Sequence, residues 1–336
     1  MTNLTSMGDL AQSHMMRRHV AEARQQMNRL LTEVSTGQSQ DAGDRLGGDF
    51  TTLAGLDRSL STLSAYKAAG AEAAILAGTT QNILGSIQDT AVSAAQALIA
   101  GASSGDAIRT GTLATESRQA FGAVITALNG QVAGRSLFAG AATDGAATGS
   151  ADTILMALEA AVAGLTSADD IAAAVTAWFD AGATGYGGTA YQGSAAPPAA
   201  MQLGEGTTAQ LAVTADDPVL RKVLAGLATG AILSSAALTG QQGQVSLLAR
   251  SAGEALLTAN TAMADPRAGV GTVEEAIDTA LTANATETSA LQQARLSLLS
   301  VDEYEAATAL TETETQLKTL YALTARLSQL SLAEYL

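Results

Sequence analysis

The two histidines are the first residues whose type could support chemistry. His14 and His19 lie five positions apart, whereas two zinc ligands on one helical face are usually about four apart. The spacing disfavours a metal site, so we expect neither a metal nor a cofactor. The chain contains no cysteine, which excludes disulfides, thiolate metal sites and cysteine nucleophiles.

Two pairs of adjacent aspartates could bind a cation. Asp169-Asp170 and Asp216-Asp217 both precede helical patterns, where carboxylates commonly cap backbone N–H groups. Capping is therefore the preferred interpretation, and cation binding is the alternative. Gly185, Gly187 and Gly188 do not form a dinucleotide-binding fingerprint, and neither a phosphate-binding loop nor a catalytic triad is recognisable. We predict that the protein is not an enzyme.

Charge and composition exclude further classes of protein. The 32 acidic residues outnumber the 17 Lys and Arg residues, and the net charge of -15 argues against nucleic-acid binding. The sequence lacks the run of about 18 apolar residues that a membrane span needs. Its N-terminus lacks the apolar core of a secretory signal peptide. Aromatic residues make up 3% of the chain, which suits long packed helices better than a compact enzyme.

The clearest structural pattern lies at the C-terminal end. Residues 301–336 contain no Gly or Pro, and their leucines form one apolar stripe at near-heptad spacing. Such a helix would span roughly 50 Å at about 1.5 Å per residue, so it needs an equally long partner. The stripe consists of Leu310, Leu317, Leu320, Leu323, Leu327 and Leu330.

A matching stripe lies near the N-terminus and consists of Met16, Val20, Ala23, Met27, Leu30 and Val34. We predict that the two terminal helices pair antiparallel and place both chain ends at one end of a rod. Residues 1–15 carry a second apolar face that includes Leu4, Met7 and Leu10. One monomer can hardly cover both faces, so we expect neighbouring subunits to cover the second; the alternative is a frayed start of the chain.

The middle of the chain begins with helices and then changes composition. Residues 53–98 read as one long helix that could be broken near Gly78, and a turn at 101–106 leads to a helix over 106–132. Between Arg135 and Arg221 the chain has no Lys or Arg but many Asp, Glu and Gly residues. This shift indicates an acidic inserted domain.

The insert is expected to be mixed α/β. We predict helices over 153–163 and 168–180, and a hairpin of 201–203 with 207–213. Asp217-Pro218 reads as an N-cap followed by Pro at the first helical position, which opens a helix through Leu227.

Helical periodicity returns from Gly240. One apolar stripe stops before Asp265-Pro266, and the next places Asn284 and Glu287 on its seam. Polar residues at such positions commonly fix helix register, and we expect that role here.

These patterns predict a mainly α protein. Both termini form a long antiparallel helical rod or coiled coil, and a smaller mixed α/β domain is inserted. The expected segments are residues 1–140, the N-terminal half of the rod; residues 141–235, the acidic Gly-rich insert; and residues 236–336, the C-terminal half of the rod.

Three motifs resemble the flagellin superfamily, and within it the hook–filament junction proteins, also called third hook-associated proteins. They are Val34-Ser-Thr-Gly37, the Leu-Asn-Gly-Gln-Val to Phe-Ala-Gly segment at 128–140, and the tail from Tyr304 to Leu336. The resemblance covers roughly residues 1–140 and 235–336. The acidic-Pro-Ala loop usual after Ser-Thr-Gly is replaced by residues 41–49, so that loop's details do not transfer.

The resemblance implies a structural adapter that joins hook to filament by self-assembling into a ring or helical layer. The implied partners are about eleven copies of itself, the first hook-associated protein, flagellin and a cytoplasmic export chaperone. It also implies secretion through the flagellar export channel with an uncleaved signal, and residence at the hook–filament junction. A flagellin-type filament subunit and a soluble coiled-coil scaffold are the alternatives.

We expect the assembly interface to lie on the two terminal helices. For the heptad positions among these residues, ordinary intramolecular coiled-coil packing is the alternative role. The expected residues are Leu4, Met7, Leu10, Met16, Val20, Met27, Leu30, Leu31, Leu317, Leu320, Leu323, Leu327, Leu330 and Leu336.

Overall fold

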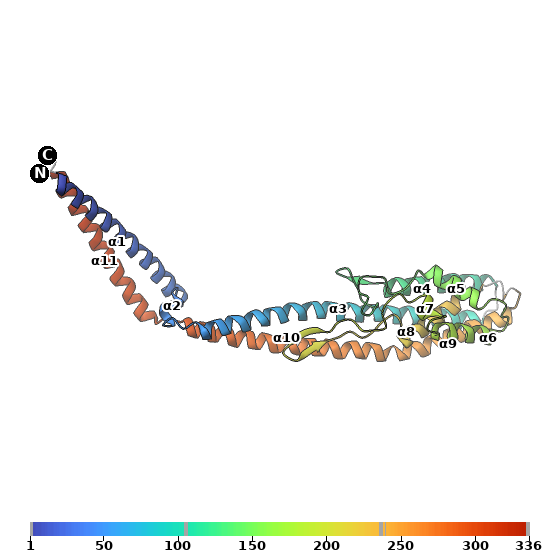
Figure 1. The fold of residues 1–336 in the computed structure, drawn as a ribbon. Coiled ribbons are helices and arrows are strands. Elements are labelled where there is room, and N and C mark those ends of the chain that lie inside the picture. Colours follow the sequence, from blue (N-terminus) through green and yellow to red (C-terminus); the bar gives the residue numbers. More distant parts are fainter. Residues whose placement is uncertain (1–2, 104–106, 235–237, 239, 334–336) are drawn as a thin grey trace. The chain divides into compact units, whose positions relative to one another are not determined.

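The computed structural model describes residues 3–103, 107–234, 238 and 240–333. These residues are mostly in long helices, with two small two-stranded sheets, which confirms a mainly α protein with a small mixed region (Figure 1). The chain forms two compact units: Met1–Leu63 with Thr286–Leu336, and Ser64–Ala285.

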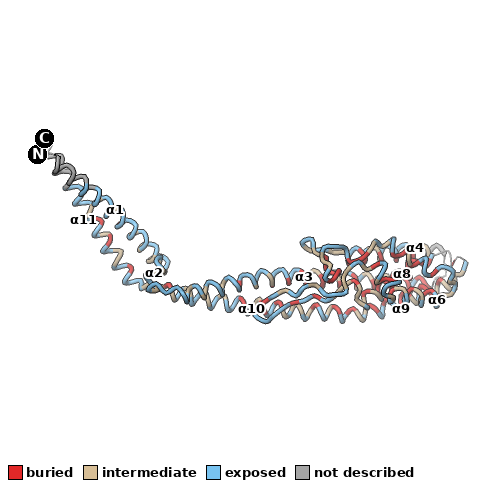
Figure 2. The backbone as a smooth tube through the Cα atoms, viewed as in Figure 1, coloured by how far each residue is buried: buried red, intermediate tan, exposed pale blue. Residues whose placement is uncertain are grey.

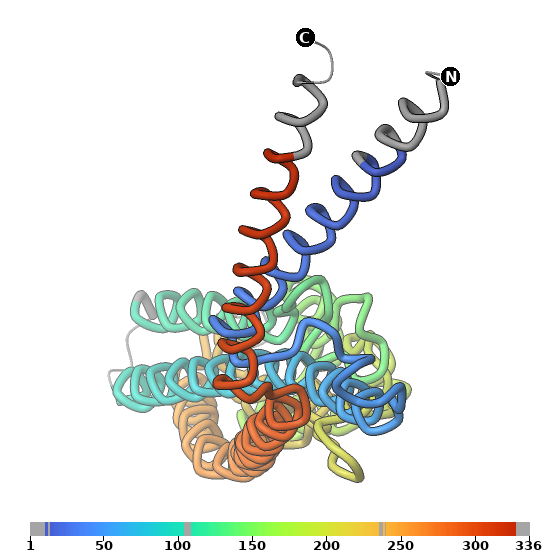
Figure 3. The backbone as a smooth tube through the Cα atoms, turned by 90° about the vertical axis from the view of Figure 1, so that its left-hand side faces the viewer, coloured from blue at the N-terminus to red at the C-terminus, as the bar shows by residue number. Residues whose placement is uncertain are grey.

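The first unit is built around the two terminal helices. Helix α1 (Asn3–Thr36) and helix α11 (Glu303–Ala333) lie side by side and antiparallel (Figures 1 and 3). The Arg24 Nε atom donates to the Tyr321 hydroxyl at 2.7 Å, and the Arg24 guanidinium carbon lies 5.5 Å from the centre of that ring. The predicted pairing of the two terminal helices is therefore confirmed.

The interior of this helix pair is thin. Ala23 of α1 and Ala306, Thr313 and Leu317 of α11 are buried, and most other described side chains of the pair are half-buried or exposed (Figure 2). The Thr313 hydroxyl donates to the Ala309 carbonyl within its own helix at 2.8 Å, so it needs no partner across the seam. Small residues let the helices approach closely but bury little apolar area.

Two longer helices start or end in the first unit and continue into the second. Helix α3 (Thr51–Ala102) is preceded by the short α2 (Ala42–Arg45), and α10 (Ala264–Leu299) precedes α11. The possible break near Gly78 is absent, because α3 runs through it without interruption.

The second unit is organised around helix α8 (Pro218–Ala231). Every residue from Val223 to Ala231 is buried, as expected for a helix that is enclosed on all sides. It packs against α4 (Ala107–Leu128), α6 (Ala168–Asp180) and α9 (Gln242–Ala262). The buried residues concentrate in this unit, as Figure 2 shows.

The helix crossings of α8 depend on glycine. A Cβ atom on Gly230 would lie 2.5 Å from the Ser117 Oγ atom of α4, and one on Gly226 would lie 2.6 Å from the Leu256 Cγ atom of α9. Both glycines therefore set how closely α8 approaches its neighbours.

The predicted helices of the insert are confirmed with small shifts of boundary. Helix α5 spans Ala151–Ala161 and α6 spans Ala168–Asp180. Helix α8 begins at Pro218, and the Asp217 carboxylate accepts a hydrogen bond from the Val219 amide at 2.8 Å. The domain boundaries at residues 140 and 235 stay a prediction; the insert shares one apolar core with α3, α4 and α9.

One predicted helix ends too late. Helix α4 stops at Leu128 rather than at Val132, because the next residues form the strand β1 (Gln131–Val132). It pairs antiparallel with β2 (Arg135–Ser136). The turn between them has positive φ at Ala133 and Gly134, 51° and 78°, as two-residue hairpin turns require.

The second hairpin is confirmed, with a shorter second strand than predicted. Strand β3 (Met201–Gly204) pairs antiparallel with β4 (Thr207–Ala209), and the short α7 (Tyr186–Thr189) precedes them in the chain.

The two polar residues predicted on the α10 seam behave differently from each other. Asn284 is buried, but its Nδ2 atom donates to the Leu203 carbonyl of β3 at 2.7 Å. This face of α10 is therefore turned towards the hairpin. Glu287 is exposed, so its predicted place on a buried seam is wrong.

Candidate assembly interface

The backbone connects the end of α1 to the start of α11. Gly37 has a φ of 69°, the left-handed conformation that commonly ends a helix at glycine, and its carbonyl accepts from the Val301 amide at 3.1 Å. The Ser39 amide donates to the Leu299 carbonyl at 2.8 Å. The two breaks in the helices, one in each half of the chain, are thus hydrogen-bonded to each other.

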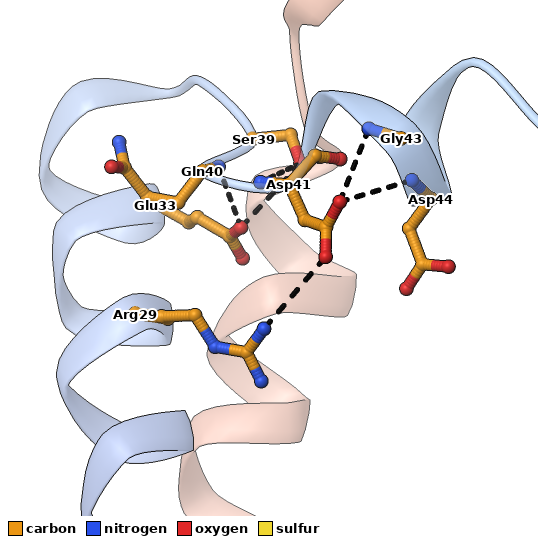
Figure 4. A network of polar contacts seen from close by, with 7 residues as sticks. All are labelled: Arg29, Glu33, Ser39, Gln40, Asp41, Gly43 and Asp44. Carbon is orange, nitrogen blue, oxygen red and sulfur yellow. Dashed lines mark hydrogen bonds and ion pairs between the residues drawn. The ribbon is translucent and has the colours of Figure 1, made fainter. Parts of the chain in front are cut away.

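Side chains of α1 hold the loop that follows. The Glu33 Oε1 atom accepts from the Gln40 amide at 2.8 Å and from the Ser39 hydroxyl at 3.5 Å (Figure 4). This carboxylate therefore binds the loop backbone directly after the Ser-Thr-Gly motif.

Asp41 organises the rest of the loop. Its Oδ1 atom accepts from the amides of Gly43 and Asp44, at 3.1 and 3.2 Å, and thereby caps α2. Its Oδ2 atom lies 3.9 Å from the Arg29 Nη1 atom (Figure 4). Both partners of this ion pair are about half exposed, so the pair contributes little stability in water. The loop that departs from the family pattern has its own capping arrangement.

The predicted interface residues of α1 fall into two groups. Met16, Val20, Met27 and Leu30 are half-buried, whereas Leu31 is 46% exposed. The first group follows the stripe paired with α11, and the pairing accounts for its partial burial. Leu31 has no such cover.

The same division holds on α11. Leu317 is buried and Leu320 is half-buried, whereas Leu323 is 43% exposed. The remaining predicted residues lie outside the part of the chain whose side chains the structure describes: Leu4, Met7, Leu10, Leu327, Leu330 and Leu336.

Several exposed apolar side chains of this unit were missed in the sequence because they lie off the stripes. They are Phe50, Leu296, Tyr304 and Tyr321; Met15, which is also exposed, belongs to the second apolar face predicted for residues 1–15. Tyr304, in the first turn of α11, is 83% exposed. A large aromatic residue just outside an apolar stripe was the available signal. Single exposed apolar side chains are normal, whereas contiguous patches of them mark surfaces for association.

Residues from the candidate metal sites make ordinary structural contacts. The His19 Nδ1 atom lies 3.4 Å from the Glu22 carboxylate, and both side chains are mostly exposed. Asp217 caps α8, and the Asp216 carboxylate lies 3.8 Å from the Arg221 Nε atom. Over the described residues, no three His, Cys, Asp or Glu side chains gather as metal ligands would.

No helix in the described ranges has the length and apolar character needed to cross a membrane.

The second unit contains a titratable group with a shifted pKa. Burial raises the pKa of Tyr186 above its usual range, and the negative charge of Asp216 raises it further. The Tyr186 hydroxyl donates to the Ala215 carbonyl at 3.0 Å. Rings of Trp178 and Phe179 lie 6.4 and 5.4 Å from that of Tyr186, centre to centre, so this cluster stabilises the fold of the insert.

The C-terminal helices match a family of known proteins. Residues 254–336 match the family model described as the bacterial flagellin C-terminal helical region. This stretch is similar to the C-terminal helices of flagellin. It covers the end of α9 and all of α10 and α11, so the resemblance to the flagellin superfamily is confirmed for these C-terminal helices.

A solved structure is also similar to this chain. It is provisionally assigned as a flagellar hook-associated protein from Vibrio parahaemolyticus, with 16% identity and a TM-score of 0.48 over 72% of this chain and 94% of that chain. Likeness at this level does not assign a function. No curated protein sequence matches. The family match of residues 254–336 supports a structural role in the flagellum.

Proposed function

We propose that this chain is a structural adapter of the bacterial flagellum that joins hook to filament by self-assembly through its terminal helices. The observation that carries the proposal is the surface of the α1–α11 pair. Leu31 of α1 is 46% exposed, and Tyr304 and Leu323 of α11, which lies in the stretch that matches the flagellin model, are 83% and 43% exposed.

Two helices alone cannot bury these side chains. Their shared interior is filled by Ala23, Ala306 and Leu317, and the large apolar groups lie outside it. Further helices packed against the pair would remove that surface from water, at about 25 cal/mol for each Å² of apolar area. When the contacting surfaces differ, such packing continues from copy to copy and builds rings or helical layers.

The full proposal includes the partners that the family resemblance implies. About eleven copies would form the layer, between the first hook-associated protein and flagellin. A cytoplasmic chaperone would bind the C-terminal helix before export through the flagellar channel.

Immunogold labelling of sheared flagella tests this location. A single band of label at the hook–filament boundary would support the adapter. Flagella from cells that lack the gene are the control and should carry no label. Cytoplasmic protein with unlabelled flagella would contradict the proposal and favour a coiled-coil scaffold.

A filament subunit is the second candidate, because the matching family model is that of flagellin. A filament subunit polymerises into long filaments without other proteins, whereas an adapter does not. Electron microscopy of the purified protein at high concentration separates the two. Long filaments, together with label along the whole flagellum, would replace the adapter by the filament subunit.

A further inference from the structure

A groove with a volume of about 770 Å³ runs along α3 in the second unit. Residues of α3 and α4 line it, together with Arg267 of α10. From Gly85 to Ala97 the α3 side of the groove is about 18 Å long at about 1.5 Å per residue. Half of the lining residues are Gly, Ala or Ser, which allows another helix to approach closely. They are Gly85, Ser86, Ser93, Ala94, Ala97, Ser117 and Ala120.

Charges follow one another along this groove in a defined order. The Arg267 Nη1 atom donates to the Gln88 Oε1 atom at 2.6 Å, which holds the cation beside that turn of α3. Asp89 follows, and Glu116 of α4 lies further along, because α4 runs antiparallel to α3 with Leu113 against Gly101. Within the described residues, Asp89 and Glu116 are exposed and form no ion pair.

The exposed face of α9 has the complementary shape and charge. Leu247, Arg250, Glu254 and Leu257 lie within about 80° of one another around the helix, at about 100° per residue. Leu247 and Leu257 are 55% and 40% exposed, and Arg250 has no ion-pair partner in the part of the chain that the structure describes. The face is about 15 Å long, which fits the groove.

We propose that this face of α9 binds in the α3–α4 groove of a second copy of the chain, antiparallel to the second copy's α3. In this direction Glu254 lies opposite Arg267, and Arg250 lies one turn further along, opposite Asp89. Leu247 then covers the small residues near Ser93. A parallel orientation would instead place Glu254 beside the carboxylates.

The inference rests on the self-assembly in the proposed function and adds a second contact, outside the terminal helices. The two surfaces are different, so the contact is heterologous and each copy keeps one groove and one α9 face available for the next.

Disulfide cross-linking tests this contact, because the natural chain has no cysteine. Full-length Ser93→Cys and Leu247→Cys proteins, with different tags, are mixed and oxidised. The contact predicts a disulfide between the two variants in the mixture and none in either variant alone. Met156→Cys, which is exposed on α5, replaces Leu247→Cys as the control and should not cross-link to Ser93→Cys.

Charge reversal tests the register. Arg250→Glu in the Leu247→Cys protein should lower the yield of the mixed disulfide about tenfold, because it places like charges together. Asp89→Arg in the Ser93→Cys partner should restore the yield. Lys222→Glu makes the same change of charge at an exposed site of α8 away from the α9 face and should leave the yield unchanged.

The outcomes separate this contact from the proposed function. Absence of a mixed disulfide, or equal yields with and without Arg250→Glu, overturns the contact even if immunogold label still marks the hook–filament boundary. A high yield of the mixed disulfide, together with no label on flagella, would support the contact and contradict the adapter proposal.

Discussion

At the scale of single residues, buried polar groups fix how the insert packs. The Asn284 amide donates to the Leu203 carbonyl, and the Tyr186 hydroxyl donates to the Ala215 carbonyl. Asn284 could be found in the sequence as a polar residue in an apolar stripe. Its partner could not, because it is a backbone carbonyl about eighty positions away that only the folded hairpin brings to α10.

Replacing Asn284 with Leu should destabilise the hairpin. The Leu203 carbonyl would lose its donor in a buried site, at a cost of about 1–3 kcal/mol. Hydrogen exchange of the β3 and β4 amides should become faster, and urea should unfold the protein at a lower concentration. Glu287→Leu, an exposed site on the same helix, should change stability by less than about 0.5 kcal/mol. Unchanged exchange in Asn284→Leu would show that the hydrogen bond does not hold the hairpin.

The raised pKa of Tyr186 predicts that the folded protein loses stability in alkali. Its pKa is raised in the folded protein, so the folded state keeps a proton that the unfolded state loses near pH 10. Above that pH the folded state binds more protons, and stability falls as pH rises. Absorbance at 295 nm should show fewer ionised tyrosines at pH 11 in the folded wild type than after unfolding. Tyr186→Phe should reduce that difference, and the remainder belongs to Tyr191, whose pKa burial also raises. An unchanged difference in Tyr186→Phe would show that Tyr186 does not cause it.

At the scale of elements, glycines decide how closely α8 packs. Gly230 faces Ser117 of α4 with no room for a methyl group, whereas Gly269 of α10 faces open space. Helix propensity assigns the same cost to glycine at both positions, so the sequence alone could not show which glycine is needed for close packing.

Gly230→Ala and Gly269→Ala should therefore have opposite effects. Alanine at 230 must displace Ser117 or separate the helices, which typically costs about 1–3 kcal/mol. Alanine at 269 gains up to about 1 kcal/mol of helix propensity. Thermal unfolding followed by circular dichroism should show Tm lowered in the first protein and raised in the second. A raised Tm for Gly230→Ala would mean that the crossing has more freedom than the structure shows.

The two kinds of leucine on the terminal helices should separate folding from assembly. Leu31→Ser together with Leu323→Ser changes exposed residues and should leave the monomer's stability within about 0.5 kcal/mol per site while reducing incorporation into flagella. Leu317→Ser changes a buried residue and should destabilise the helix pair by about 2 kcal/mol or more. Circular dichroism and immunogold labelling give the two readouts. Normal incorporation of the double variant would show that Leu31 and Leu323 do not contribute to the interface.

At the scale of the whole molecule, periodicity was the reliable guide. It predicted the antiparallel terminal helices, whereas the Asp217-Pro218 capping signal predicted the start of α8. Periodicity could not predict that α8 would be the centre of the second unit, because apolar residues on every side of a short helix do not show which side faces the core. It also extended α4 too far, because the hairpin after Leu128 depends on positive φ angles that periodicity does not register.

Removing residues 2–15 tests the assembly role of the chain's start. The second unit contains none of these residues, so its thermal unfolding should be unchanged. The shortened α1 keeps the stripe from Met16 to Val34, so the protein should stay monomeric and soluble. Immunogold labelling should find it absent from flagella. Normal incorporation would show that the first fifteen residues do not contribute to the interface.

The backbone hydrogen bonds between residues 37–39 and 299–301 have a mechanical consequence. In the adapter proposed above, a filament turning in a viscous medium would put tension and torque on each subunit. The force would pass here through two chain segments held together by hydrogen bonds, so neither segment would carry the whole load. These hydrogen bonds would thus reinforce the place where both helices are interrupted.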